Sequence, residues 1–135
     1  MGDVFVDEEY SYLYGSRTRA TAIVRLHGDL LLVQERGFRQ FSLPGGGVHE
    51  SESPEEAVAR ELEEETGLSA VTVVPLPQCR TSDVYNTYLV FEVTATGALR
   101  VDPVELDGAK WWDGRESVPL FGYVHRVLAR LHWPS

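Results

Sequence analysis

Residues 46–68 read GGVHESESPEEAVARELEEETGL, and this stretch decides how the chain is interpreted. It holds eight acidic side chains and one basic one, and so carries −7 of the formal net charge of −9 that the whole chain has. A charge this concentrated is either the solvated face of a helix or a site for cations. The spacing of the acids within the stretch bears on the choice.

Local signals in the stretch predict a helix from about Pro54 to Thr66. Ser53 suits the N-cap, Pro54 suits the first helical position, and Glu56 follows Ser53 at the spacing of a capping box. Gly67 is a natural end, because glycine readily adopts the left-handed backbone that terminates helices.

Three acids, Glu61, Glu64 and Glu65, fall on one face of this helix when each residue is turned by about 100°. An apolar stripe at Val58 and Leu62 adjoins them. Like charges at these spacings destabilise a helix by roughly 0.2–0.5 kcal/mol per pair, and the helix dipole disfavours acids in the last turn by about 0.3–1 kcal/mol each. A bound divalent cation would remove both penalties, so we prefer a metal site to a solvated face, which stays open as the alternative.

The type of ligand narrows the choice of metal. The candidates are all hard oxygen donors, and no His or Cys is paired with them. This favours Mg²⁺ or Mn²⁺ over Zn²⁺. Because Mg²⁺ held by a few carboxylates usually works together with substrate phosphates, we expect a substrate that carries phosphate.

The spacing of the whole stretch fits a longer pattern: Gly, five residues, Glu, seven residues, Arg-Glu, an aliphatic residue, any residue, Glu-Glu, any residue, Gly and an aliphatic residue. Its nine fixed positions are filled by Gly46, Glu52, Arg60, Glu61, Leu62, Glu64, Glu65, Gly67 and Leu68. The chain thereby resembles the Nudix hydrolase family in its MutT-like form. The resemblance extends more weakly over residues 18 to 113, which include a Leu-Pro-Gly approach at 43–45 and a core-strand run at 28–36.

The resemblance implies that Glu61, Glu64 and Glu65 bind the divalent metal and that one of them serves as general base. A backbone carbonyl at Gly45 or Gly46 would complete the metal's ligands. The alternative is that these glycines do not bind metal and only allow the chain to form a tight turn.

The family resemblance also assigns supporting roles in the site to further residues. Arg60 would orient a carboxylate and Glu52 would hold Arg60, unless the two form an ordinary ion pair. Glu105, six residues before Trp111, resembles a late acid that some members use in the site. Among the Arg residues that flank the predicted second strand, Arg36 is the candidate for a substrate phosphate.

The rest of the chain predicts one α/β domain over residues 1–135. The expected strands are 18–26, 30–35, a short strand leading into Pro44, 70–76, 84–95 and 110–112, with a hairpin at 27–29, a loop at 96–109 and a second helix at about 119–132. This order predicts a mixed sheet covered by helices. The family resemblance implies a Nudix-type α/β/α sandwich with a mixed central sheet, against which the helix at 54–66 packs.

Composition limits the class of function. The acidic balance argues against stable binding to nucleic acid, which needs a basic surface. The first nine residues lack the features of a secretory signal, and no apolar run approaches the length needed to span a membrane. Cys79 stands alone, so no internal disulfide can form and a cytoplasmic location is expected. The resemblance leaves room for a homodimer, since small members often dimerise.

The expected activity is hydrolysis of a phosphoanhydride bond in a nucleoside diphosphate linked to a group X, on a small nucleotide or nucleotide-derived substrate. A nucleoside triphosphate pyrophosphohydrolase is preferred. A dinucleoside polyphosphate hydrolase, which the spacing of Tyr85 resembles, or an ADP-ribose hydrolase is the alternative, although Val84 stands where many ADP-ribose members have proline. The alternative of another class is a non-catalytic nucleotide sensor on the same fold.

Overall fold

The computed structural model describes residues 17–134. The acidic N-terminal residues therefore lie outside the described part of the chain. The elements, in chain order, are β1 (Arg17–Ile23), β2 (Arg25–Leu26), β3 (Asp29–Glu35), β4 (Gly45–Gly47), α2 (Pro54–Thr66), β5 (Ser69–Pro75), the 3-10 turn η1 (Pro77–Cys79), β6 (Thr81–Ser82), β7 (Asn86–Thr96), β8 (Leu106–Trp112) and α3 (Gly122–Leu131). None of the helices among these residues is long and apolar enough to cross a membrane.

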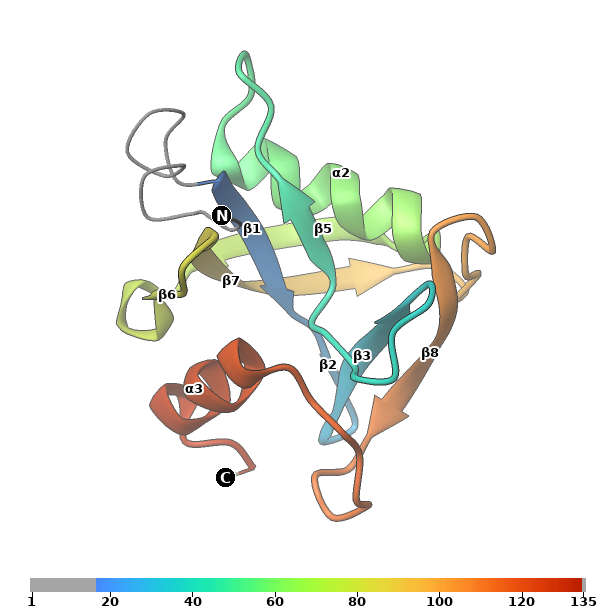
Figure 1. The fold of residues 1–135 in the computed structure, drawn as a ribbon. Helices are drawn as coiled ribbons and strands as arrows, with labels where there is room; N and C mark the ends of the chain where they lie inside the picture. Colours follow the sequence, from blue (N-terminus) through green and yellow to red (C-terminus); the bar gives the residue numbers. More distant parts are fainter. Residues whose placement is uncertain (1–16, 135) are drawn as a thin grey trace.

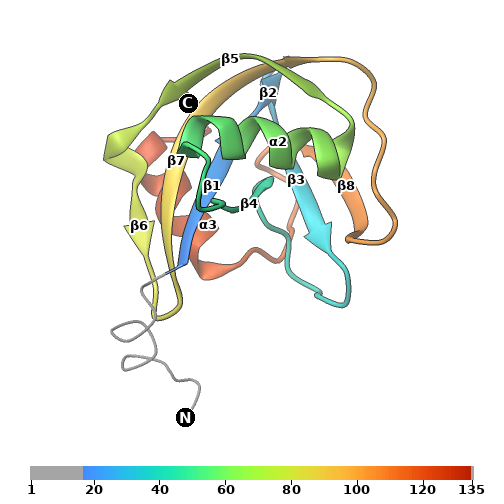
Figure 2. The same ribbon diagram turned by 90° about the horizontal axis from the view of Figure 1, so that it is seen from above.

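The strands form two sheets that lie between the two helices (Figures 1 and 2). In the larger sheet the order is β4-β1-β7-β5, with β6 paired to the start of β7. Strands β1 and β7 run parallel, whereas the other pairs in this sheet are antiparallel. The smaller sheet has the antiparallel order β2-β3-β8. The mixed sheet and the α/β/α layering were predicted correctly, but the strands are divided between two sheets.

The two faces of the strands build two separate cores. On β3, Leu30 and Leu32 pack in the cluster beneath α3, whereas Leu31 packs in the cluster beneath α2. This alternation follows from the period of two along a strand. Because both faces are covered, the three leucines are fully buried, and each such burial is worth roughly 1.5–3 kcal/mol. The helix α2 is thereby held firmly against the strands that carry the glycines at 45–47.

Helix α2 begins and ends where the sequence predicted. The Ser53 hydroxyl accepts the Glu56 N–H at 3.0 Å, and the Glu56 carboxylate accepts the Ser53 N–H at 2.9 Å, so the capping box is formed. At the other end Gly67 is left-handed, with φ of 76°. Each cap satisfies backbone groups that the helix itself cannot pair. The helix therefore has fixed ends, and the directions of its acidic side chains are set by the helical period.

Several boundaries differ from the prediction. The strand expected at 18–26 is divided, because the chain passes at Val24 from the larger sheet into the smaller one. The strand expected before Pro44 is reduced to single bridges at Phe41 and Ser42, and β4 begins only at Gly45. Strand β8 begins at residue 106, which shortens the loop expected at 96–109, and α3 begins later than expected, at residue 122. Tertiary pairing determined these boundaries, and local sequence signals do not report it.

Candidate active site

Three carboxylates converge at the C-terminal half of α2. Single oxygens of Glu61, Glu65 and Glu105 all lie within 4.8 Å of one another. The first two are one helical turn apart, and the third comes from the loop before β8. Backbone hydrogen bonds fix that loop, since the Asp102 N–H donates to the Glu65 carbonyl at 3.1 Å and the Arg36 N–H donates to the Glu105 carbonyl at 2.9 Å. All-oxygen donors at this separation fit a hard divalent cation such as Mg²⁺ or Mn²⁺.

The strand β4 passes directly beneath these carboxylates. At Gly46, a Cβ atom would stand 2.3 Å from the Glu61 carboxyl carbon, and at Gly45 one would stand 2.2 Å from the Ala20 carbonyl oxygen. Side chains at either position would displace the acid or separate β4 from β1. The glycines are therefore required for the close approach of backbone to the site, which is more than a tight turn demands. Whether a carbonyl of residue 45 or 46 binds metal stays a prediction.

Glu65 is the buried member of the three acids, with 4% of its surface exposed. Burial raises its pKa to about 8, and the neighbouring charges of Glu61 and Glu35 act in the same direction. The Gly45 N–H donates to Glu65 Oε1 at 3.1 Å, which opposes the shift only in part. A carboxyl in this position is poorly ionised at neutral pH unless a cation neutralises it. The residue thus fits a metal ligand better than a solvated helix face.

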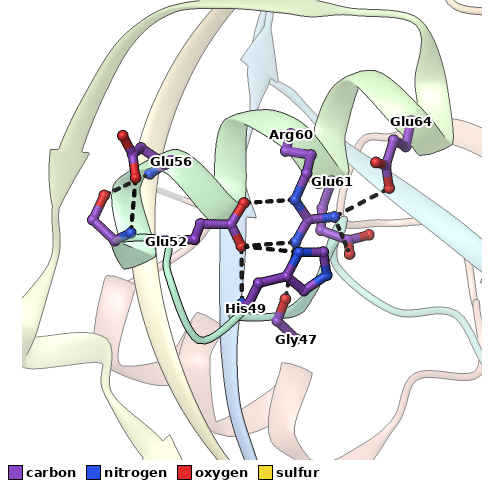
Figure 3. A network of polar contacts seen from close by, with 8 residues as sticks. Gly47, His49, Glu52, Glu56, Arg60, Glu61 and Glu64 are labelled. Atoms are coloured by element: carbon purple, nitrogen blue, oxygen red, sulfur yellow. Dashed lines mark hydrogen bonds and ion pairs between the residues drawn. The ribbon is translucent and has the colours of Figure 1, made fainter.

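Arg60 lies at the centre of a network of polar contacts that includes Glu61, one of the three carboxylates (Figure 3). It donates to both oxygens of Glu52, at 2.6 and 3.0 Å, to Glu61 at 3.0 Å and to the Gly47 carbonyl at 3.0 Å. The bonds from Arg60, together with the His49 N–H, lower the pKa of Glu52 to about 2. The carboxylates of Glu52 and Glu61 raise the pKa of Arg60. The predicted orienting roles of Arg60 and Glu52 have the geometry they need, because one guanidinium joins the turn after β4 to the Glu61 carboxylate.

Glu64 lies apart from the cluster in which the helical wheel placed it. Its side chain is 49% exposed and accepts a hydrogen bond from Arg60 at 3.2 Å. The wheel gave the angular position correctly but could not show that Arg60, one turn earlier, holds this side chain on the outer rim. The role of Glu64 as a metal ligand therefore stays a prediction, and Glu105 takes the third place in the cluster.

An open cavity of about 320 Å³, which we call the acidic cavity, contains the three carboxylates. Two cations that the sequence analysis did not single out, Arg17 and Arg19, also line it. The Arg19 guanidinium lies 3.6 Å from Glu35 and 3.4 Å from the Gly45 carbonyl oxygen. Because residue 19 pairs with Gly47 across β1 and β4, the sheet register brings this cation to the acids. The alternation along β1 could have shown that the two arginines share a face, but not what that face meets.

Arg36 is placed differently from the sequence expectation. Its guanidinium donates to the Pro103 carbonyl at 2.5 Å, and its side chain does not line the acidic cavity. The residue is exposed and supports the loop that carries Glu105. Glu105 itself has a raised pKa, first because of burial and then because of the charge of Glu61. Contact between Arg36 and a substrate phosphate stays a prediction.

Comparison with known proteins agrees with this fold. A profile of the NUDIX domain matches residues 16–127, and the chain therefore belongs to the NUDIX domain family. It is 36% identical over 95 residues to a provisionally named 8-oxo-dGTP diphosphatase of Bacillus subtilis, a match that covers 69% of this chain and 62% of that protein. It is 38% identical over 58 residues to an RNA pyrophosphohydrolase of Photobacterium profundum, covering 43% of this chain and 33% of that protein.

The fold is also shared with solved structures. A MutT NUDIX hydrolase from Burkholderia pseudomallei superposes with a TM-score of 0.74 at 24% identity, over 86% of this chain and 98% of that one. At this level of identity the likeness establishes the fold. The chain spans less than two thirds of the length of the two sequence relatives, so their activities do not transfer to it directly.

Proposed function

We propose that the chain is a divalent-metal-dependent hydrolase of phosphoanhydride bonds in nucleoside diphosphate derivatives, and that its preferred substrates are nucleoside triphosphates. The observation that carries the proposal is the convergence of Glu61, Glu65 and Glu105 in a cavity that Arg17 and Arg19 also line. Acids to hold a divalent cation and arginines to hold phosphate oxygens are the two requirements of phosphoryl chemistry.

The acids and the arginines of the acidic cavity have different roles in the proposed reaction. The cation, held by the three carboxylates, would supply charge neutralisation at the phosphate oxygens. Arg17 and Arg19 bind the polyphosphate by hydrogen bonds from their guanidinium groups. Glu105 is the acid that comes from outside the helix, and it completes the set of oxygen donors for the cation. We assign the proton of the attacking water to one of the acids of α2.

Arg60 and Glu52 act through Glu61. Because the guanidinium is held in a two-bond contact by Glu52 and also donates to the Gly47 carbonyl, it fixes the Glu61 Oε2 atom at 3.0 Å from its Nη1. One oxygen of Glu61 is thereby engaged and the carboxylate keeps a single orientation. Residues that hydrogen-bond to a metal ligand without touching the metal typically matter in this way: their removal lowers metal affinity or activity by about 10–100-fold.

The choice of nucleoside triphosphates over other substrates rests on a relative. The Bacillus subtilis protein, which is named for action on 8-oxo-dGTP, is 36% identical to this chain over 95 residues. Dinucleoside polyphosphates and ADP-ribose-type compounds are the alternatives, and the name of the Photobacterium relative adds RNA 5′ ends as a further phosphoanhydride to test.

A substrate panel tests the proposal. Nucleoside triphosphates including 8-oxo-dGTP, a dinucleoside polyphosphate, ADP-ribose and 5′-triphosphorylated RNA are incubated with the protein in Mg²⁺ or Mn²⁺, with and without chelator. We expect metal-dependent release of phosphate products, fastest from a nucleoside triphosphate, and a loss of several orders of magnitude in kcat for Glu61→Gln. Glu63→Gln is the matched control, since this acid is exposed on the same helix. If no compound is hydrolysed, the proposal fails and a nucleotide-sensing role is favoured.

A further inference from the structure

Glu105 is carried into the acidic cavity by the loop before β8, residues 97–105, which lies outside any helix or strand. The other two acids of the cluster, Glu61 and Glu65, are carried by α2, whose ends are capped. A side chain on a loop is placed only as precisely as the contacts that hold the loop. The position of the Glu105 carboxylate therefore depends on what fixes this loop on its two sides.

On one side, the loop is bonded to the C-terminal end of α2. The Arg100 N–H donates to the Thr66 carbonyl at 2.6 Å, and the Asp102 N–H donates to the Glu65 carbonyl at 3.1 Å. A helix leaves such carbonyls in its last turn without partners of its own, so the loop satisfies them. Figure 2 shows the loop passing this end of the helix. The Asp102 carbonyl in turn accepts the Glu105 N–H at 3.2 Å.

On the other side, the loop is bonded to the turn that follows β3. The Arg36 N–H donates to the carbonyl of Glu105 itself at 2.9 Å. The Arg36 guanidinium donates to the Pro103 carbonyl at 2.5 Å, and the Gly37 N–H donates to Asp107 Oδ2 at 2.9 Å. We call these three bonds the clasp. They hold the backbone of Glu105 and the residues two positions before and after it.

The clasp lies where the ladder between β3 and β8 becomes irregular. Gln34 pairs with Gly108, but Glu35 pairs with Leu106, so Asp107 is the extra residue of a bulge. A bulge interrupts the regular ladder and redirects side chains, and bulges are frequent beside active sites. Two of the three bonds of the clasp accordingly use a side chain where a regular ladder would use backbone groups alone.

We infer that Arg36 and Asp107 are positioning residues that hold Glu105 where its carboxylate meets those of Glu61 and Glu65. The inference rests on the proposed function, in which these three acids hold a divalent cation. In this role Arg36 acts through the loop and needs no contact with substrate. Both positioning side chains are exposed, so their replacement leaves the buried cores intact.

Mn²⁺ titration without nucleotide, with free Mn²⁺ followed by electron paramagnetic resonance, tests the role of Arg36. For Arg36→Met we expect the affinity to fall by about three- to tenfold, the value of one hydrogen bond. The direction is diagnostic, because removal of a positive charge would by itself strengthen the binding of a cation. Arg36→Lys keeps a donor and should recover part of the loss. Arg39→Met, an exposed arginine in the same connection, is the matched control and should keep wild-type affinity.

Two variants of Asp107 separate the hydrogen bond from the charge. Asp107→Ala loses the acceptor for the Gly37 N–H and should lower Mn²⁺ affinity by about three- to tenfold. Asp107→Asn keeps an acceptor oxygen without the charge and should retain wild-type affinity. An equal fall in both variants would assign the effect to charge and overturn the positioning role of this residue.

A double-mutant cycle shows whether Arg36 acts through Glu105. In the Glu105→Gln background, Arg36→Met should change Mn²⁺ affinity by less than about twofold, because the carboxylate that it positions is already gone. The same fall in both backgrounds would overturn the inference, since Arg36 would then act independently of Glu105. Thermal unfolding in chelator identifies any variant that fails to fold, and the two Asp107 variants then carry the test.

The titration needs no turnover, so it separates this inference from the proposed function. Metal-dependent hydrolysis by the wild type, with unchanged Mn²⁺ affinity in Arg36→Met, would overturn the inference and leave the function standing. A raised KM in that variant without a change in Mn²⁺ affinity would assign Arg36 to substrate phosphate instead. Lack of hydrolysis, with an effect of Arg36→Met that disappears in Glu105→Gln, would support the positioning role alone. Absence of Mn²⁺ binding by the wild type would overturn both.

Discussion

Gly46 lies so close to Glu61 that a Cβ atom at residue 46 would stand 2.3 Å from the Glu61 carboxyl carbon. The backbone of β4 and the acid of α2 are thus fitted to each other, and the position of one sets the position of the other. Replacement of Gly46 by Ala should push the Glu61 carboxylate away from Glu65 and Glu105 without removing any acid.

For Gly46→Ala we expect kcat to fall by about 10–100-fold, in the range seen when the orientation of a metal ligand is lost. Circular dichroism should show a folded protein, because the displaced atoms belong to the far end of a flexible side chain. Gly108→Ala is the control, since a Cβ at residue 108 meets nothing within 4 Å. Full activity in Gly46→Ala would show that the position of Glu61 is unimportant.

The contact between Arg60 and Glu52 gives a second prediction. Arg60→Lys keeps the charge but cannot make two parallel bonds to Glu52 while also reaching Glu61 and the Gly47 carbonyl. We expect metal affinity, measured by Mn²⁺ titration, to fall by about 10–100-fold. Glu116→Gln, which removes the exposed ion pair with Lys110, should leave the affinity unchanged. Equal metal affinities in Arg60→Lys and wild type would show that Arg60 and Glu52 form only an ordinary ion pair.

Arg19 is predicted to bind substrate phosphate. Arg19→Met should raise KM by about tenfold or more, because a hydrogen bond to a charged group is worth roughly 1.5–3 kcal/mol. Arg19→Lys should recover part of the loss. Arg25→Met serves for comparison, as Arg25 is paired with Glu92 and does not line the acidic cavity. An unchanged KM in Arg19→Met would assign phosphate binding to other cations.

The raised pKa of Glu65 predicts how the free energy of unfolding depends on pH when no divalent cation is present. Its pKa rises on folding from 4.5 to about 8, so the folded protein binds this proton more tightly than the unfolded chain does. The resulting stabilisation is fully present below about pH 4.5 and is lost as the pH rises through about 8. In chelator, the free energy of unfolding should therefore fall across this window more in the wild type than in Glu65→Gln. Parallel pH profiles would contradict the buried, protonated state of Glu65.

Much of α2 could be predicted from the sequence, because its signals are local. Ser53, Glu56 and Gly67 satisfy backbone groups a few residues away, and the helical period alone directs Glu61 and Glu65 to one face. Glu105 could be assigned only by resemblance, since its position depends on backbone bonds between its loop and the C-terminal end of α2.

The sheet register explains the residues that were missed. Arg19 reaches the acids because β1 pairs with β4 at Gly47, and no local signal encodes that pairing. Glu64 lies on the predicted face of α2, but its carboxylate accepts a hydrogen bond from Arg60 and lies outside the cluster, so its role as a metal ligand stays a prediction.

Mn²⁺ titration of the wild type and of Glu105→Gln tests the central claim most directly, namely that one divalent cation site is built from α2 and from the loop before β8. We predict that Glu105→Gln and Glu61→Gln each lower Mn²⁺ affinity by about tenfold or more, whereas Glu64→Gln has a smaller effect because its half-exposed side chain lies outside the cluster. Wild-type affinity in Glu105→Gln, together with complete loss in Glu64→Gln, would contradict the site described by the structure.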